Sequence, residues 1–206
     1  MGLVSGMAFL LKGGFMMWPL LGSGLVALTV IFERLYVFTK QYATPTTFTQ
    51  TALGLVKEGK LSESKTFCQT CATPVSDTLL SGMAHLNSPL DVMALSMKNT
   101  AEGWVPLLEK RLELLDTIIT AAPLMGLLGT ITGMMSSFQV LSEKGVNEPN
   151  AITGGVSEAL IATATGLVIA LVCLVAYNYL SSRLKAMIYD MESAGSRLTE
   201  CRLDLQ

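Results

Sequence analysis

Charged residues are scarce in this chain, which has 206 residues, of which 15% are charged and 50% are hydrophobic. Soluble domains carry about 25% charged residues, so the scarcity argues against an ordinary soluble protein or a soluble enzyme. The charges are also bunched, because residues 13–32, 117–142 and 159–182 contain none. A bilayer core needs about 20 apolar residues per helix. The sequence therefore predicts an all-α integral membrane protein with three transmembrane helices.

Residues that bind metals or carry out redox chemistry are few as well. His85 is the only histidine, and it lies between the first two apolar runs, so we assign it no role in proton handling. Cys68 and Cys71 form a C-x-x-C, but a zinc site needs about four ligands, and only His85 and Cys201 could join them, at irregular spacing. The thioredoxin-like context of a redox motif is absent. We expect unpaired cytoplasmic thiols, no metal and no cofactor.

A glycine-rich loop for binding phosphate is also missing. Gly126, Gly129 and Gly133 lie within an apolar run, where such spacing is typical of helix packing in membranes. We therefore expect no nucleotide hydrolysis, no enzymatic activity and no nucleic-acid partner. The ion gradient across the membrane is left as the source of energy.

The basic residues are distributed unevenly around the three runs. Of 14 lysines and arginines, only Lys12 and Lys144 would lie on one side of the membrane. Positive residues concentrate on the cytoplasmic side, so we predict a periplasmic N-terminus and a cytoplasmic C-terminus. The first run is longer than the apolar part of a signal peptide and ends at Glu33-Arg34, which favours a retained helix. The expected location is the bacterial inner membrane.

These observations predict the following layout. The segments are a short periplasmic lead-in (1–14), transmembrane helix one (15–38), a cytoplasmic helical region (39–116), transmembrane helix two (117–141), a short periplasmic loop (142–152), transmembrane helix three (153–181) and a cytoplasmic C-terminal helix (182–206). Gly59 predicts a helix end and Pro74 a helix start. The apolar pattern from Leu107 to Ile119 has no breaker. Helices two and three are therefore both expected to continue as long helices into a cytoplasmic helical bundle.

Small residues follow one face of helix two and one face of helix three. Helices in lipid associate through such faces, because small residues allow the backbones to approach closely. Helix one carries mostly larger side chains and is expected to face lipid. The candidates for pore lining or helix packing are Gly126, Gly129, Gly133, Gly155, Ala159 and Gly166.

Glu158 is the unusual residue of helix three, in the segment GGVSEALIATATGLVIALVCLVAYN (154–178). Burial disfavours the charged form of a carboxyl group, so Glu158 could be neutral and ionised in turn, as a proton relay requires. Thr165 lies seven residues further on and almost in line with it. Thr130 and Thr163 could bond water or a carboxyl group on the same path. In the alternative interpretation, Glu158 is solvated at the outer headgroups and each threonine bonds its own helix.

One carboxylate is too little for a path across a membrane, so either oligomerisation or an acidic partner is required.

APLMGLLGTITGMMSSF (122–138) and the segment 154–178 closely resemble the two signature helices of the MotA/TolQ/ExbB proton-channel family, and most closely those of its ExbB/TolQ branch. The resemblance implies a homopentamer around an ExbD/TolR-like dimer of single-span proteins, each of which brings one aspartate. It implies pathway roles for Glu158, Thr163 and Thr130. Thr165 aligns where members of the family vary and is a secondary candidate.

The resemblance also implies a function. The chain would be a proton-channel subunit of an inner-membrane motor for biopolymer transport. The motor would use the proton motive force to energise TonB-dependent transport. The implied partners are an ExbD-like protein, a TonB-like protein and membrane lipid. The alternatives are a TolQ-like subunit for envelope integrity, a gliding-type motor, or a passive scaffold in which Glu158 only caps a helix end. Flagellar members have four membrane helices and lack this glutamate, which argues against a flagellar motor. The residues alone leave proton and sodium transport both open.

Overall fold

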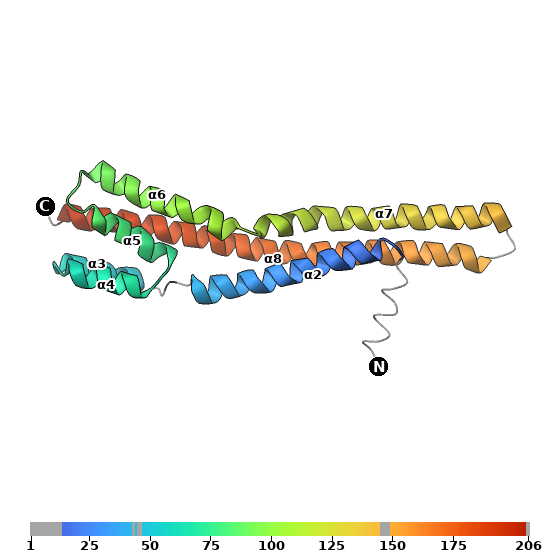
Figure 1. Cartoon of the computed structure of the whole chain (residues 1–206), viewed down its shortest axis with the longest axis horizontal. Coiled ribbons are helices and arrows are strands. Elements are labelled where there is room, and N and C mark those ends of the chain that lie inside the picture. The colour runs from blue at the N-terminus through green and yellow to red at the C-terminus, as the bar shows by residue number, and fades with distance from the viewer. Residues whose placement is uncertain (1–13, 43, 45–46, 145–148, 205–206) are drawn as a thin grey trace, which may run out of the picture. The chain divides into compact units, whose positions relative to one another are not determined.

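The computed structural model describes residues 14–42, 44, 47–144 and 149–204, and every residue of regular structure in this part is helical (Figure 1). The helices are α2 (Met17–Tyr36), the π-helical turn η2 (Val37–Gln41), α3 (Phe48–Lys57), α4 (Leu61–Thr70), α5 (Pro74–Ala84), α6 (Leu90–Glu109), α7 (Leu112–Lys144) and α8 (Pro149–Asp204). The expected all-α class is confirmed. Residues 1–13 of the predicted lead-in and residues 145–148 of the predicted periplasmic loop lie outside the described residues.

Three helical segments of the described chain are long and apolar enough to cross a membrane. They are Met17–Lys40, Leu90–Ser142, which joins α6 and most of α7, and Thr153–Asp204. This number agrees with the three charge-free runs of the sequence, because each run supplies the apolar part of one segment. The expectation of three such helices is confirmed.

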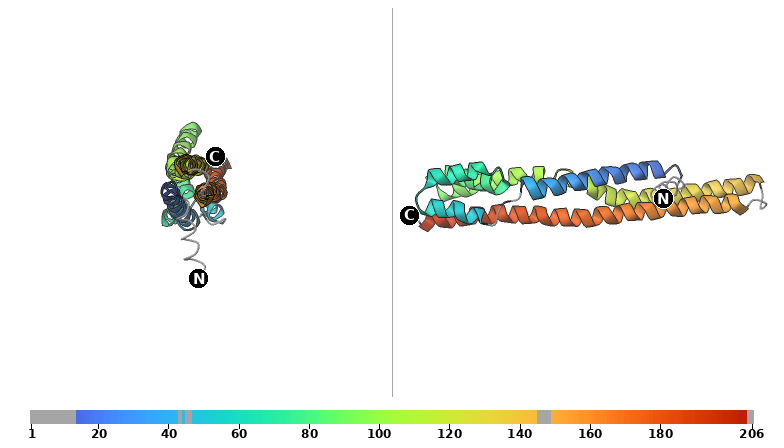
Figure 2. Two further views of the ribbon diagram at one scale, coloured as in Figure 1. Left: turned by 90° about the vertical axis from the view of Figure 1, so that its right-hand side faces the viewer. Right: turned by 90° about the horizontal axis from the view of Figure 1, so that it is seen from below.

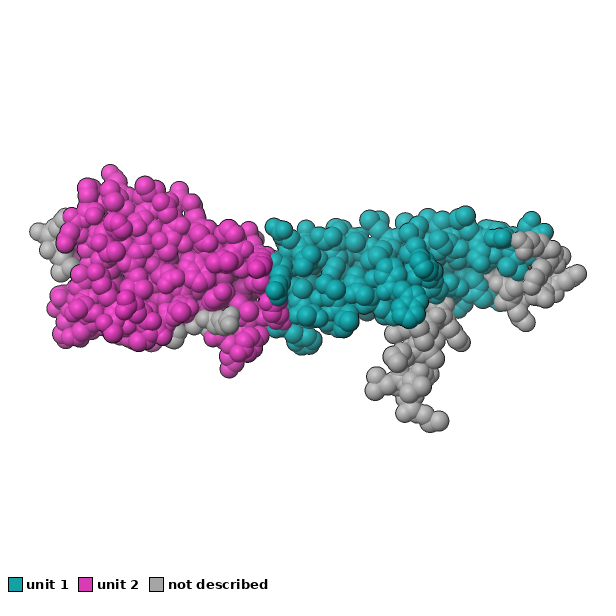
Figure 3. Space-filling view, viewed as in Figure 1, with its two compact units in different colours: residues 1–32, 111–178 teal, residues 33–110, 179–206 magenta. Residues whose placement is uncertain are grey.

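The chain divides into two compact units, which Figure 3 colours separately. Unit 1 takes in the described parts of residues 1–32 and 111–178, and so holds most of α2, all of α7 and the first half of α8. Unit 2 takes in the described parts of residues 33–110 and 179–206, and so holds α3 to α6 and the end of α8. Helix α8 therefore contributes to both units.

Within unit 1, α7 and α8 lie side by side and antiparallel, as the views in Figures 1 and 2 agree. Their contacts run in opposite directions along the two helices, since Ala122 meets Gly166, Gly126 meets Thr163 and Gly133 meets Ala159. Helix α2 also joins this packing, because an added Cβ atom on Gly24 would lie 3.2 Å from Ile169 Cδ1 of α8, and Leu20 is fully buried. Other large side chains of α2 are exposed, among them Leu25 (69%) and Phe32 (68%). That α2 faces lipid stays a prediction.

The predicted continuous helix through residues 107–119 is wrong. Helix α6 ends at Glu109 and α7 begins at Leu112, and between them Arg111 adopts a φ of 69°. An α-helix requires negative φ at every residue, so Arg111 interrupts it although its side chain favours helices. The Arg34 guanidinium donates to the Leu107 carbonyl oxygen at 3.3 Å and so satisfies an acceptor of the last turn of α6.

Helix α8, in contrast, continues without a break from Pro149 to Asp204. The expectation that helix three runs on as one helix beyond its apolar part is confirmed. The reason is local, because after residue 149 the sequence contains no proline, and the glycines of α8 keep helical backbone angles.

Unit 2 contains the short helices of the polar region. Helix α3 ends at Lys57 and is followed by Gly59 at a φ of 79°, a left-handed conformation that suits glycine. Helix α5 begins at Pro74, and the Thr73 side chain accepts a hydrogen bond from the Ser76 backbone amide in a capping box. Both sequence signals for helix ends are therefore confirmed.

The core of unit 2 is built from aromatic, aliphatic and methionine side chains. The Phe48 and Phe67 rings of α3 and α4 stack with their centroids 5.0 Å apart. Helix α5 approaches α6 and α8 at Gly82, where an added Cβ atom would lie 2.5 Å from Met97 Sδ and 2.6 Å from Leu198 Cδ2. The absence of a side chain at Gly82 thus allows three helices to meet closely.

Candidate functional site

Glu158 lies in the third turn of α8 and is half-buried in unit 1. Its carboxyl group lies against the backbone of Gly14, just before α2 begins. A Cβ atom on Gly14 would overlap Glu158 Oε1 and would lie 2.6 Å from Cδ and 3.1 Å from Cγ of the same side chain. The carboxyl group is therefore in direct contact with the start of another helix of the same chain.

The three candidate threonines form different hydrogen bonds. Thr130 Oγ1 donates to the Leu127 carbonyl oxygen at 2.6 Å, and Thr165 Oγ1 donates to the Ile161 carbonyl oxygen at 2.8 Å, so both bond within their own helices. Thr163 Oγ1 donates across to α7, to the Gly126 carbonyl oxygen at 2.9 Å. Of these three hydroxyls, Thr163 alone links two helices, and the other two follow the ordinary behaviour of threonine in helices.

These bonds separate the four pathway candidates into two pairs. The Gly126 carbonyl oxygen accepts a hydrogen bond from the Thr163 hydroxyl. In a helix, the amide of Thr130 donates to the carbonyl oxygen four residues earlier, which is also that of Gly126. Thr130 and Thr163 are therefore neighbours across the α7–α8 contact. Glu158 and Thr165 lie on another side of α8, because five residues of helix turn Thr163 by about 140° from Glu158. The four candidates therefore lie on two sides of α8 and not in one row, and Glu158 and Thr165 are about 10 Å apart along the helix axis.

The small residues predicted for pore lining or packing all lie in the α7–α8 contact of unit 1. An added Cβ atom on Gly126 would lie 3.0 Å from Thr163 Cα, and one on Gly129 would lie 2.7 Å from Ala162 Cβ. An added Cβ atom on Gly133 would lie 3.0 Å from Ala159 Cβ. Gly155 and Gly166 meet Ser137 and Ala122 of α7 in the same way. Close backbone approach explains why glycine and alanine stand at these positions.

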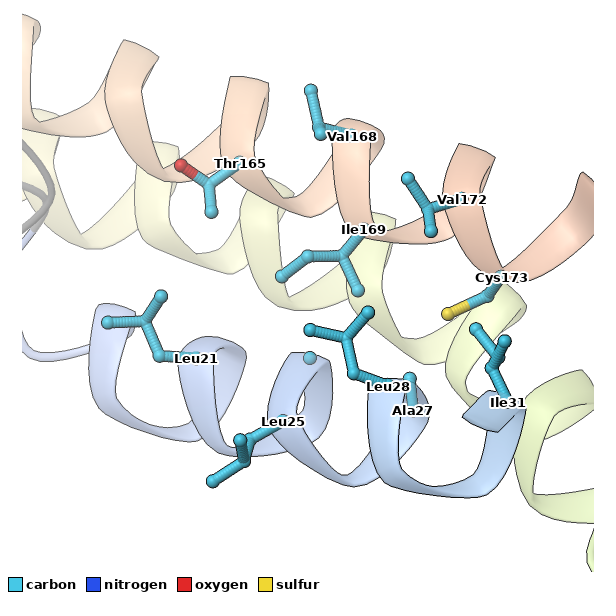
Figure 4. A pocket seen from close by; sticks show the side chains of 11 residues that line it. Leu21, Leu25, Ala27, Leu28, Ile31, Thr165, Val168, Ile169, Val172 and Cys173 are labelled. Atoms are coloured by element: carbon cyan, nitrogen blue, oxygen red, sulfur yellow. The ribbon is translucent and has the colours of Figure 1, made fainter. Parts of the chain in front are cut away.

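A cavity of about 350 Å³ lies between α2 and α8 in unit 1 (Figure 4). Leu28 of α2 and Ile169 of α8 point toward each other across it. Thr165 lines the cavity, but its hydroxyl already donates to its own helix, so the lining is almost wholly apolar. The remaining lining residues are Leu21, Gly24, Leu25, Ala27, Ile31, Val168, Val172 and Cys173.

Cys173 lines the cavity in unit 1, whereas the other cysteines and the histidine lie in unit 2. All four cysteines are free thiols, and Cys68 is fully buried in unit 2. Burial, and to a smaller extent the neighbouring Cys71, raises the pKa of the Cys68 thiol to about 11. His85 Nδ1 lies 3.0 Å from the Ser81 carbonyl oxygen of its own helical turn. Within the described ranges, no three His, Cys, Asp or Glu side chains are grouped to hold a metal ion.

Sequence reasoning missed Gly14 as part of the site. Gly14 stands outside the two motifs of helices two and three, and a glycine before a helix is common, so no pattern distinguished it. The cavity was missed for a related reason. The in-line relation of Glu158 and Thr165 indicated a shared stripe on α8, but not that α2 covers that stripe.

Comparison with known proteins adds independent information. The family model of the MotA/TolQ/ExbB proton channel family matches residues 71–193, which include Glu158 and the three threonines. A putative biopolymer transport protein, ExbB-like 3 of Synechocystis sp., is 32% identical over 174 residues, which cover 84% of this chain and 83% of that protein.

Two further relatives are similar over shorter stretches. Biopolymer transport protein ExbB of Aquifex aeolicus is 37% identical over 86 residues, which are 42% of this chain and 58% of the relative. Tol-Pal system protein TolQ of Haemophilus influenzae is 36% identical over 107 residues, which are 52% of this chain and 45% of the relative. The match to the family model and the long similarity to an ExbB-like protein agree with the three apolar helices of the structure. The chain belongs to the MotA/TolQ/ExbB proton channel family and is close to ExbB.

Proposed function

We propose that this chain is the proton-channel subunit of an inner-membrane motor that energises TonB-dependent transport across the outer membrane. The observation that carries the proposal is Glu158, a half-buried carboxyl group on a helix that is long and apolar enough to cross a membrane. Glu158 takes up and releases the proton. Membership of a proton-channel family and similarity to proteins named for biopolymer transport support this role.

The proposed energy source is the ion gradient, and the chain itself catalyses no chemical reaction. One elementary charge that moves through 100 mV releases about 2.3 kcal/mol. A mechanical step of several kcal/mol therefore requires several protons. Such a cycle needs a group that can bind and release one proton at a time, and a single carboxyl group per chain meets this requirement.

A partner is part of the proposal, because Glu158 stands at the edge of one charge-free run and none of the three runs contains an acid to which it could pass a proton. We place the aspartate of an ExbD-like single-span dimer next to the Thr130–Thr163 pair, whose hydroxyls would bond water or that carboxyl group. Glu158 lies on the side of α8 that faces α2, about 140° away from Thr163. Water therefore bridges the two pairs in this proposal, since no direct hydrogen bond joins Glu158 to Thr163.

The proposed assembly is a homopentamer around this partner. Large apolar side chains of α7 are exposed on the single chain, including Leu124 (65%), Met135 (66%) and Phe138 (68%). Contiguous exposed apolar surface marks contact with lipid or protein. Neighbouring copies and membrane lipid together cover this surface in the proposed ring. The N-terminus is periplasmic and the C-terminus cytoplasmic, as the basic residues favour.

A TolQ-like role in envelope integrity is the second candidate, and the similarity to TolQ of Haemophilus influenzae favours it. Complementation separates the two. The chain and its partner would be expressed in one strain that lacks its ExbB and ExbD and in another that lacks its TolQ and TolR. Growth on a nutrient that requires TonB supports the first role, and restored resistance to detergent supports the second.

Proton flux into liposomes that contain this chain and its ExbD-like partner tests the mechanism. Glu158→Gln removes the exchangeable proton while keeping the shape of the side chain, so we expect flux to fall to the background of empty liposomes. Glu192→Gln is the matched control, because Glu192 is an exposed residue of the same helix outside the apolar run. Co-purification with the partner verifies assembly of each variant. Equal flux in the wild type and Glu158→Gln would refute the role of Glu158 and favour a scaffold.

A further inference from the structure

We infer that Gly14 is a positioning residue for Glu158, because only a residue without a side chain lets the carboxyl group lie against the start of α2. The inference rests on the proposed role of Glu158 in ion flux. It makes α2 part of the ion path, whereas the motifs that indicated this path lie only in α7 and α8.

The contact itself is close and involves the reactive end of the side chain. An added Cβ atom on Gly14 would overlap Glu158 Oε1 and lie 2.6 Å from Cδ. Gly14 also has a φ of 73°, a backbone conformation that residues other than glycine rarely adopt. Two independent features therefore require glycine here, namely the space that Glu158 occupies and the backbone conformation.

The position of Gly14 explains why a carboxyl group is held there. The Gly14 carbonyl oxygen accepts from the Met17 amide at 3.1 Å, so Gly14 directly precedes the first turn of α2. The first amides of a helix have no acceptors within the helix, and the positive end of the helix dipole attracts a carboxylate. The first turn of α2 contains no acidic residue of its own. Glu158 supplies that carboxyl group from α8.

A second contact shows that the two helices have a defined register. An added Cβ atom on Gly24 of α2 would lie 3.2 Å from Ile169 Cδ1 of α8. Gly24 follows Gly14 by ten residues and Ile169 follows Glu158 by eleven. The contact of Gly14 with Glu158 is therefore one end of a continuous α2–α8 interface, and a displacement of α2 along α8 would move the carboxyl group.

The first test compares Gly14→Ala with two glycine controls in the liposome flux assay. Gly59→Ala places alanine at a φ of 79° where no atom lies within 4 Å, so it reports the backbone strain alone. Gly22→Ala lies in α2 in open space and reports an added methyl group alone. We expect Gly14→Ala to lower flux by about tenfold, since small displacements of a reacting group are costly, and both controls to stay near the wild type. Equal flux in Gly14→Ala and the wild type would overturn the inference.

Rescue by a shorter acid distinguishes positioning from a general loss of structure. Glu158→Asp withdraws the carboxyl group by one methylene and makes room for the alanine methyl group. We expect Gly14→Ala with Glu158→Asp to conduct better than the product of the two single losses, because the shorter acid removes the clash and leaves only the backbone strain of alanine at a φ of 73°. Independent positions would instead multiply their losses, and that result would overturn the inference.

A crosslink tests the contact without reference to flux. In a chain whose four native cysteines are replaced by serine, Gly14→Cys with Glu158→Cys should form a disulfide on mild oxidation, because an added Cβ atom on Gly14 would lie 3.1 Å from Glu158 Cγ, the position that a cysteine sulfur takes. Gly22→Cys with Glu158→Cys is the control and should form none. If the wild type shows no flux, the proposed function fails, and the crosslink still decides the contact. Absence of the crosslink in the folded protein would overturn the inference.

Discussion

The tightest test of the α7–α8 packing is Gly166→Ala. An added Cβ atom at Gly166 would lie 2.5 Å from the Ala122 carbonyl oxygen and 3.3 Å from Gly126 Cα, both backbone atoms of α7. A flexible side chain could rotate away from a new methyl group, but a backbone carbonyl within a helix cannot. The two helices must therefore separate locally, and the neighbouring contacts along the interface loosen with them.

The magnitude follows from two opposing terms. An extra methyl group in a well-packed core costs about 1–3 kcal/mol, and the backbone contact at Gly166 justifies the upper part of this range. Replacing glycine by alanine within a helix gains roughly 0.5–1 kcal/mol. We therefore expect Gly166→Ala to lower the free energy of unfolding by about 2 kcal/mol. Gly22→Ala, with no atom within 4 Å of the new methyl group, should keep the helical gain alone.

The assay is titration of the purified chain in mild detergent with sodium dodecyl sulfate, followed by the loss of helical circular dichroism. The expected order of stability is Gly166→Ala below the wild type and Gly22→Ala at or above it. Both variants make the same chemical change in a helix, so their difference measures the packing term. A Gly166→Ala chain as stable as the Gly22→Ala chain would refute the reasoning that backbone contact holds α7 and α8 together.

Two further predictions concern single side chains. Thr163→Val removes the hydrogen bond to α7 and should lower the stability in the same titration by about 0.6 kcal/mol, the average for such bonds in membranes. Thr165→Val should cost less, because the Thr165 hydroxyl bonds only its own helix. Equal losses would contradict the difference between the two hydroxyls. Burial raises the pKa of the Cys68 thiol to about 11, so folding favours the neutral form of this thiol. The unfolded pKa is about 8.5. The stability that the thiol contributes is therefore present below about pH 8.5 and is lost as the pH rises through 11. Cys68→Ala should flatten this decline in stability, and Cys68 should react with iodoacetamide at neutral pH more slowly than the half-buried Cys71 unless the protein is unfolded.

The sequence by itself determined the helical class, the three apolar segments and the small-residue faces of α7 and α8. These features depend on local composition and on the helical period, both of which are visible along the chain. The ends of α3 and α5 were predictable for the same reason, because glycine and proline act on the backbone where they stand. The similarity to the family motifs also indicated Glu158 as a candidate pathway residue, and its role stays a prediction.

Only the tertiary structure decided what each polar group of α8 contacts. Thr163 bonds the Gly126 carbonyl oxygen while Thr165 bonds its own helix, and Glu158 meets the backbone of Gly14. The break at Arg111 was hidden as well, because an arginine with a positive φ looks like an ordinary helix former in the sequence. These outcomes depend on how α2 and α7 are rotated and shifted against α8. That arrangement is set by many side chains packing at once, and the local pattern of any one helix does not contain it.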